Sequence, residues 1–234
     1  MEYLWDGLRE AAGMLWRLDP EVCSIAWVSL KVTFLSTALA AAAGVPLGAW
    51  LAVSQFRGKR VAVGILNALM ALPTVVVGLF LYSLLTRRGL LGPLGLLYTV
   101  TAMVAGQFLL AVPLVAAMTV GVVQGADPRV IPTARTLGAS PWRARLTLMG
   151  EVRWGLVAAV LAGFGRVFGE VGVSMMVGGN IRGYTRTLTT AIALQTGRGE
   201  FALGLALGIV LLGVALLVNG AVQLVPRGAA GREP

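Results

Sequence analysis

Long apolar runs separated by short polar segments are the dominant pattern of this sequence. A membrane-spanning α-helix needs about 20 predominantly apolar residues. Runs of sufficient length predict five spans, at residues 24–54, 61–86, 96–123, 154–177 and 201–225. Strands of a transmembrane barrel would alternate apolar and polar positions over about ten residues, and these runs do not alternate. The pattern predicts an all-α membrane protein with about five transmembrane helices.

The segment before the first span has a different pattern. Apolar residues recur there at helical spacing, at Leu4, Leu8, Ala11, Ala12 and Leu15. Trp5 and Trp16 lie about three turns apart and suit the headgroup region of a membrane. We therefore predict that residues 1–21 form an amphipathic helix on the membrane surface, with an extension of the first span as the alternative. Residues 22–226 are predicted to form a single transmembrane domain that includes a cytoplasmic loop at 124–153.

Composition supports the membrane assignment and excludes several kinds of site and partner. Of the 234 residues, 57% are hydrophobic and only 12% are charged, about half the charge of a soluble domain. A net charge of +9 would suggest nucleic acid in a soluble chain. Here the basic residues lie in short loops, so we expect membrane lipid and no nucleic acid as a partner. A single cysteine and no histidine exclude an internal disulfide and a Cys/His metal cluster, and we predict no metal site.

The basic residues also predict an orientation. Ten of them fall in residues 57–60, in the loop 124–153 and after residue 226, which share one side of the membrane. The other side has seven, and five acidic residues between positions 2 and 21 offset part of that charge. By the positive-inside rule, we predict a multi-pass plasma-membrane protein with its N-terminus outside and its C-terminus in the cytoplasm.

The loop at 124–153 contains two helix-start signals. Asp127 followed by Pro128 is typical of an N-cap with proline at the first helical position, and Ser140 followed by Pro141 repeats the signal. Gly138 can adopt the left-handed conformation that ends a helix. We expect two short helices joined at this glycine, the second ending near residue 148. Since a plain connector needs only about 4–6 residues, this loop is expected to contact another protein.

The same loop resembles the cytoplasmic signature of ABC importer membrane subunits, which reads Glu-Ala-Ala, three residues, then Gly. Ala134, Leu137, Gly138 and Ala139 match that pattern, whereas Pro132 and Thr133 replace its Glu and first Ala. The closing Leu-Pro of the signature is replaced by Gly150 and Glu151. The resemblance implies a type I ABC importer permease fold. It also implies that an ATPase subunit docks on Pro132, Thr133, Ala134, Leu137, Gly138, Ala139 and Ser140.

A second polar segment follows the fourth span, at residues 174–195. Asn180 and Thr187 supply polar side chains, and Arg182 and Arg186 supply forked donors that suit tetrahedral oxyanions. The alternative is a solvated loop with a short interfacial helix at 184–196. The run MMVGGNIRGYTRTLTTAIAL within this segment resembles tungstate permeases, which are relatives of molybdate and sulfate permeases, and the likeness extends from about residue 20 to 222.

Arg166 and Glu170 lie inside the fourth predicted span. They are four residues apart and therefore share a helix face. Because a charge at mid-membrane costs about 2.5–3.5 kcal/mol on insertion scales, we expect them to pair and to face the bundle interior or a pathway. A structural pair without substrate contact is the alternative. The candidate pathway residues are Arg166, Glu170, Asn180, Arg182, Arg186 and Thr187. Pro73, Pro113 and Gln107 within the spans predict kinks and interhelical hydrogen bonds.

The resemblance implies that two copies of the chain form the pathway, with two cytoplasmic ABC ATPase subunits and an external oxyanion-binding protein. The chain has no Gly-x-x-x-x-Gly-Lys-[Ser/Thr] loop, so ATP and magnesium are expected on the ATPase and no cofactor on this chain. The predicted function is tungstate import, with molybdate or sulfate import as the alternative. A channel subunit and an intramembrane enzyme are more remote alternatives. An intramembrane enzyme would need an acid–base pair within the spans, and Glu170 is the only mid-span carboxylate.

Overall fold

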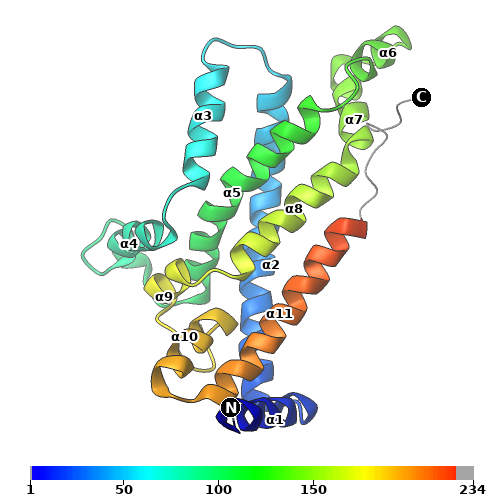
Figure 1. Cartoon of the computed structure of the whole chain (residues 1–234). Helices are drawn as coiled ribbons and strands as arrows, with labels where there is room; N and C mark the ends of the chain where they lie inside the picture. The colour runs from blue at the N-terminus through cyan, green and yellow to red at the C-terminus, as the bar shows by residue number, and fades with distance from the viewer. Residues whose placement is uncertain (1, 225–234) are drawn as a thin grey trace.

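The computed structural model describes residues 2–224, and within that range the chain is helical and without strands (Figure 1). The helices are α1 (Glu2–Trp16), α2 (Pro20–Val53), α3 (Lys59–Met70), α4 (Thr74–Leu85), α5 (Val100–Gln124), α6 (Val130–Thr136), α7 (Pro141–Glu151), α8 (Arg153–Phe168), α9 (Gly172–Gly178), α10 (Leu188–Arg198) and α11 (Phe201–Leu224). A 3₁₀ turn, η1 (Gly92–Leu94), precedes α5. The all-α prediction is confirmed.

Three of these helices, α2, α5 and α11, are each long and apolar enough to cross a membrane. Two further pairs qualify if each bent pair is counted as one span: α3 with α4, bent by 93°, and α7 with α8, bent by 64°. Within the described residues the structure therefore contains up to five spans. The predicted end of the fifth span at residue 225, the domain boundary at 226 and the C-terminus lie outside the residues that the structure describes.

The second predicted span, 61–86, is not one straight helix. It breaks between Met70 and Thr74, with Pro73 at the N-cap of α4. A proline lacks an N–H donor and disfavours helical geometry at the residue before it, here Leu72. The kink predicted at Pro73 is thus a complete break of the helix.

The fourth predicted span, 154–177, is also broken. Helix α8 ends at Phe168, and α9 begins at Gly172. Glycines flank the break, and they weaken a helix relative to other residues. The two broken segments meet: α9 packs on α4 (Figure 1), and Val173 and Leu81 share one apolar core.

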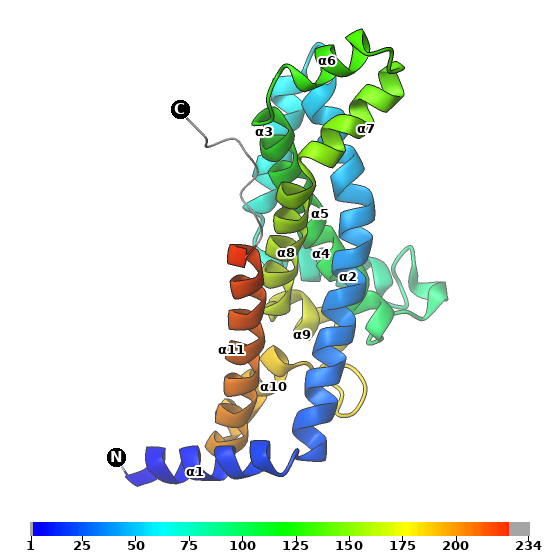
Figure 2. The ribbon, with the colours of Figure 1, turned by 90° about the vertical axis from the view of Figure 1, so that its right-hand side faces the viewer.

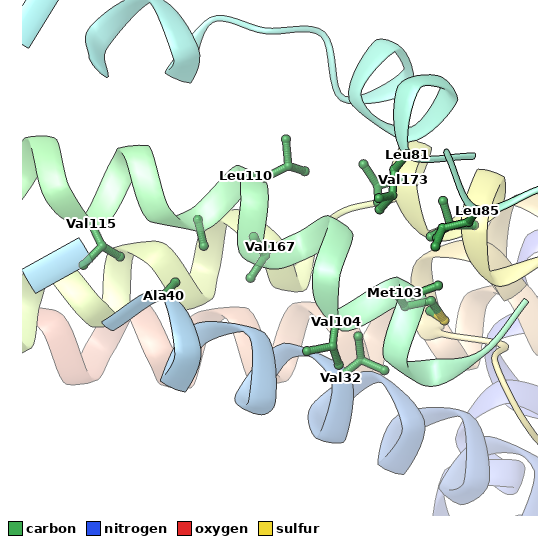
Figure 3. Packing of buried hydrophobic residues seen from close by; sticks show 13 residues of the cluster. Val32, Ala40, Leu81, Leu85, Met103, Val104, Leu110, Val115, Val167 and Val173 are labelled. Carbon is green, nitrogen blue, oxygen red and sulfur yellow. The ribbon is translucent and has the colours of Figure 1, made fainter. Parts of the chain in front are cut away.

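Helices α2 and α5 form the central pair of the bundle. A Cβ atom at Gly48 would lie 2.4 Å from the carbonyl oxygen of Ala116, so only glycine permits this approach of α2 to α5. The main core then fills the space between α2, α4, α5, α8 and α9 (Figure 3). Val32, Met103 and Val167 are fully buried there. This core fixes the positions of the polar residues described below.

Helix α1 is separate from α2 and runs across one end of the bundle (Figure 2). The chain turns at Leu18, which has a positive φ, and the Asp19 carboxylate then caps α2 by accepting a hydrogen bond from the Glu21 backbone N–H at 2.8 Å. The alternative of one continuous first span is therefore wrong. Placement of α1 on the membrane surface stays a prediction.

Candidate coupling and translocation sites

Helices α6 and α7 protrude from the end of the bundle opposite α1 (Figure 2). The Asp127 carboxylate accepts a hydrogen bond from the Arg129 backbone N–H at 2.8 Å, as an N-cap does. This bond, and then the bond from the Arg129 side chain, lowers the pKa of Asp127. Regular helix begins at Val130, two residues later than predicted, which is within the usual variation of helix ends.

Gly138 ends α6 as the sequence predicted. Its φ is +86°, in the left-handed region. Its N–H donates to the Arg135 carbonyl, and the Ala139 N–H donates to the Ala134 carbonyl, both at 3.0 Å. This pair of bonds is a Schellman motif, which satisfies carbonyls at the helix end and fixes the turn. Ser140 then caps α7 by accepting from the Arg143 N–H at 3.3 Å, and α7 continues to Glu151 instead of ending near residue 148.

A shallow groove of about 580 Å³ lies between α6 and α7. Five of the seven predicted docking residues line it: Thr133, Ala134, Leu137, Gly138 and Ala139. Pro132 and Ser140 are exposed nearby but do not line it. No residue of α6 is buried, and Leu137 is almost fully exposed. We call this the elbow groove.

Toward the opposite end, Arg166 and Glu170 form the predicted pair, with 3.3 Å between Arg166 Nη1 and Glu170 Oε2. Glu170 is buried in the break between α8 and α9, whereas the Arg166 side chain is partly exposed. The other carboxylate oxygen of Glu170 accepts a hydrogen bond from the Val173 backbone N–H at 3.1 Å. Glu170 therefore both neutralises Arg166 and caps α9.

Arg182 and Arg186 meet an acidic residue that the sequence analysis did not place near them. Both form ion pairs with Glu21, in the first turn of α2, and Arg186 Nη1 lies 3.5 Å from Glu21 Oε1. The positive charge of these two arginines is thus partly balanced. The start signal Asp19-Pro20 could have located Glu21, because it places that residue in the first turn of the first span.

The solvated-loop alternative holds only for residues 181–184, which are exposed. The threonine segment that follows is buried, and it comprises Thr185, Thr187, Thr189 and Thr190. Thr187 and Thr190 form a capping box at the start of α10, which begins at Leu188 and not near residue 184. The Thr189 hydroxyl donates to the Glu170 carbonyl at 2.8 Å. Asn180, at a φ of +50°, donates from Nδ2 to the Thr190 carbonyl at 3.3 Å. Hydrogen bonds thus join Asn180, Thr187 and the backbone of Glu170 into one region.

A buried polar connection links this region to the centre of the bundle. Ser36 on α2 donates to Gln107 Oε1 on α5 at 3.0 Å, and Gln107 Nε2 donates to Ser174 Oγ on α9 at 3.4 Å. The interhelical role of Gln107 was predicted. Its partners Ser36 and Ser174 were missed, since small hydroxyl residues are common in spans and give no distinctive signal.

The long apolar helices are those of an integral membrane protein. Residues 44–230 match the family described as "Binding-protein-dependent transport system inner membrane component", and the chain belongs to this family. It is a multi-pass membrane protein.

Named relatives cover nearly the whole chain. The tungstate uptake system permease protein TupB of Peptoclostridium acidaminophilum is 39% identical over 222 residues, covering 95% of this chain and 97% of the relative. TupB of Campylobacter jejuni is 40% identical over 219 residues, covering 94% of this chain and 92% of the relative. The molybdenum transport system permease protein ModB of Escherichia coli K12 is 29% identical over 230 residues, covering 92% of this chain and 98% of the relative.

A solved structure of the MetNI methionine ABC transporter in an inward-facing conformation matches with a TM-score of 0.70 and 23% identity. The match covers 92% of this chain and 99% of the chain in that structure. It confirms the predicted permease fold.

Proposed function

We propose that this chain is the permease subunit of an ABC importer that moves an oxyanion, tungstate, across the membrane. The observation that carries the proposal is the identity of 39% and 40% to two tungstate permeases over nearly the full length. The molybdenum permease of Escherichia coli has similar coverage but only 29% identity. Molybdate, an anion of the same charge and shape, is the second candidate.

The partners follow from the proposed function. Two ATPase subunits bind ATP and magnesium and dock on the elbow grooves of two copies of this chain, while an external binding protein delivers the anion. The exposed Leu137 and the rigid turn at Gly138 support the docking role. In this arrangement the elbow end is cytoplasmic, and the end carrying α1 and α10 is outside. The chain itself performs no bond chemistry.

The proposed mechanism uses the rigidity of the elbow and the breaks in the bundle. A displacement of α6 is transmitted through α7 to α8, because a single residue, Val152, separates the last two. Helix α8 ends at Phe168. Glu170 follows two residues later and caps α9, which packs on α4. Movement imposed on the elbow by ATP binding therefore reaches the broken helices, and rigid-body rocking of the two copies opens the pathway to alternate sides.

The test is transport in vesicles that contain the permease, its ATPase and its binding protein. We expect ATPase activity and uptake to be stimulated by tungstate, less by molybdate and hardly by phosphate. Exchanging the binding protein while the permease is held constant separates the contribution of each to this preference. Uptake of a cation or an uncharged solute, with no response to any oxyanion, would refute the substrate assignment and leave the family intact.

A further inference from the structure

A second groove, distinct from the elbow groove, lies between α2 and α7. Its volume is about 290 Å³. Its α2 wall includes Pro46 and Trp50, and its α7 wall includes Trp142, Arg145 and Leu146. Figure 2 shows the two helices side by side at this end of the bundle. We call this the α2–α7 groove.

The two grooves use different faces of α7. Trp142, Arg145, Leu146 and Met149 line the α2–α7 groove, at the i, i+3, i+4, i+7 spacing of a single helix face. Arg143 and Thr147 line the elbow groove instead. The two grooves therefore lie on different sides of α7.

The walls of the α2–α7 groove are apolar but are not covered by this chain. Trp50 is 54% exposed and Trp142 is 67% exposed. Adjacent large apolar side chains of this kind mark a surface that receives an apolar partner. Part of a lipid acyl chain would cover both indole rings.

Among the described residues that line the groove, Arg145 is the only charged one. Within the part of the chain that the structure describes, it forms no ion pair. An arginine beside apolar walls can extend its alkyl stem along them and present its guanidinium to an anion. The groove therefore combines an apolar floor with an unpaired cation.

The position of the groove along the membrane normal also fits a lipid. Helix α2 has 34 residues, which at 1.5 Å per residue is about 51 Å. The hydrocarbon core of a bilayer is about 30 Å thick, so the end of α2 extends into the headgroup region. Trp50 lies within one turn of that end, at the level that tryptophan prefers.

We propose that the α2–α7 groove binds an anionic phospholipid, with an acyl chain against Trp50 and Trp142 and the phosphate at Arg145. Basic pockets beside transmembrane helices recognise anionic headgroups in this way. The inference needs only that the chain lies in a membrane. It does not depend on tungstate as the substrate.

The test measures quenching of tryptophan emission by brominated lipid. The full chain is reconstituted into phosphatidylcholine vesicles that contain increasing fractions of either brominated phosphatidylglycerol or brominated phosphatidylcholine. The chain has six tryptophans, so the contribution of Trp142 is obtained by subtracting the emission of a Trp142→Phe variant. We expect phosphatidylglycerol to quench Trp142 half-maximally at about one-fifth of the fraction that phosphatidylcholine requires.

Matched charge variants locate the headgroup. Arg145→Gln should remove the preference for phosphatidylglycerol, whereas Arg143→Gln, with the same loss of charge on the other face of α7, should retain it. Equal losses in the two variants would mean diffuse attraction and would overturn the proposal. So would equal quenching by the two lipids. A third outcome is that neither lipid quenches Trp142, while its emission changes when the ATPase is added or when the chain is diluted in lipid. That outcome would assign the groove to a protein partner and would also overturn the proposal.

Discussion

The carboxylate of Glu21 lies 3.5 Å from the guanidinium of Arg186, and this ion pair joins the start of α2 to the segment before α10. Only 8% of Arg186 is exposed. The same carboxylate also pairs with the exposed Arg182. One acidic residue thus holds both arginines that the sequence analysis assigned to anion attraction.

Replacing Glu21 should destabilise this end of the bundle. Glu21→Gln leaves the buried Arg186 charge without its ion-pair partner, and leaving a mostly buried polar group without a partner costs about 1–3 kcal/mol. For a chain of this size we expect the Tm in detergent to fall by roughly 2–10 °C. Glu10→Gln is the control, because Glu10 is exposed at the same end and has no ion pair among the described residues. Equal Tm shifts in the two variants would show that the ion pairs of Glu21 do not contribute to stability.

Coupling should depend on the backbone conformation of Gly138. A Cβ atom at this position meets nothing within 4 Å, so the effect of Gly138→Val comes from its φ of +86° and not from a clash. A left-handed conformation costs about 1–2 kcal/mol for such a residue. We expect Gly138→Val to insert normally, to bind the ATPase less well and to lower ATP-driven uptake severalfold.

Gly138→Asn is the matched control, because asparagine tolerates the left-handed region and should retain most of the uptake. Gly150→Ala, at a helical glycine of α7 with open space around it, should have little effect. Normal transport by Gly138→Val would show that the elbow is only a linker.

The features predicted correctly from the sequence are those encoded locally. The all-α fold follows from the length of the apolar runs, and the elbow follows from cap residues at Asp127, Gly138 and Ser140. The pairing of Arg166 with Glu170 follows from a spacing of four residues. Each signal lies within a few residues of the feature that it predicts.

The features that were missed depend on contacts between distant segments. Nothing near Arg186 in the sequence indicates that Glu21 lies beside it. The burial of the threonine segment depends in part on Ser29 of α2, whose hydroxyl accepts a hydrogen bond from the Leu188 N–H at 2.7 Å. The break after Phe168 was missed because an apolar run does not show where its helix stops.

Topology can be tested with cysteines, and burial decides where to place them. Thr187 is only 4% exposed and is unsuitable, whereas Tyr184 is 48% exposed on the same loop. The native Cys23 is exposed and must first be replaced by serine. In intact cells, a membrane-impermeant thiol reagent should label Tyr184→Cys and leave Ser140→Cys unlabelled until the membrane is opened. The reverse pattern would refute the orientation and the cytoplasmic position of the elbow.

The two arginines that pair with Glu21, Arg182 and Arg186, should behave differently when their charge is removed. The Arg182 side chain is 70% exposed, so Arg182→Gln should shift the Tm by no more than about 4 °C. If its charge attracts the anion, tungstate uptake at limiting substrate should fall about two- to fivefold at low salt and by less at high salt, since salt screens exposed charge.

Arg186→Gln removes a buried charge and leaves Glu21 with one partner, so it should lower the Tm more than Arg182→Gln does. Its effect on uptake should change little with salt, because a buried pair is poorly screened. The measurements are uptake at two ionic strengths and thermal unfolding of both variants, with Arg198→Gln as an exposed control on α10. A salt-independent loss of uptake in Arg182→Gln would contradict electrostatic attraction of the anion by Arg182, because an exposed charge that guides an anion must lose its influence as the ionic strength rises.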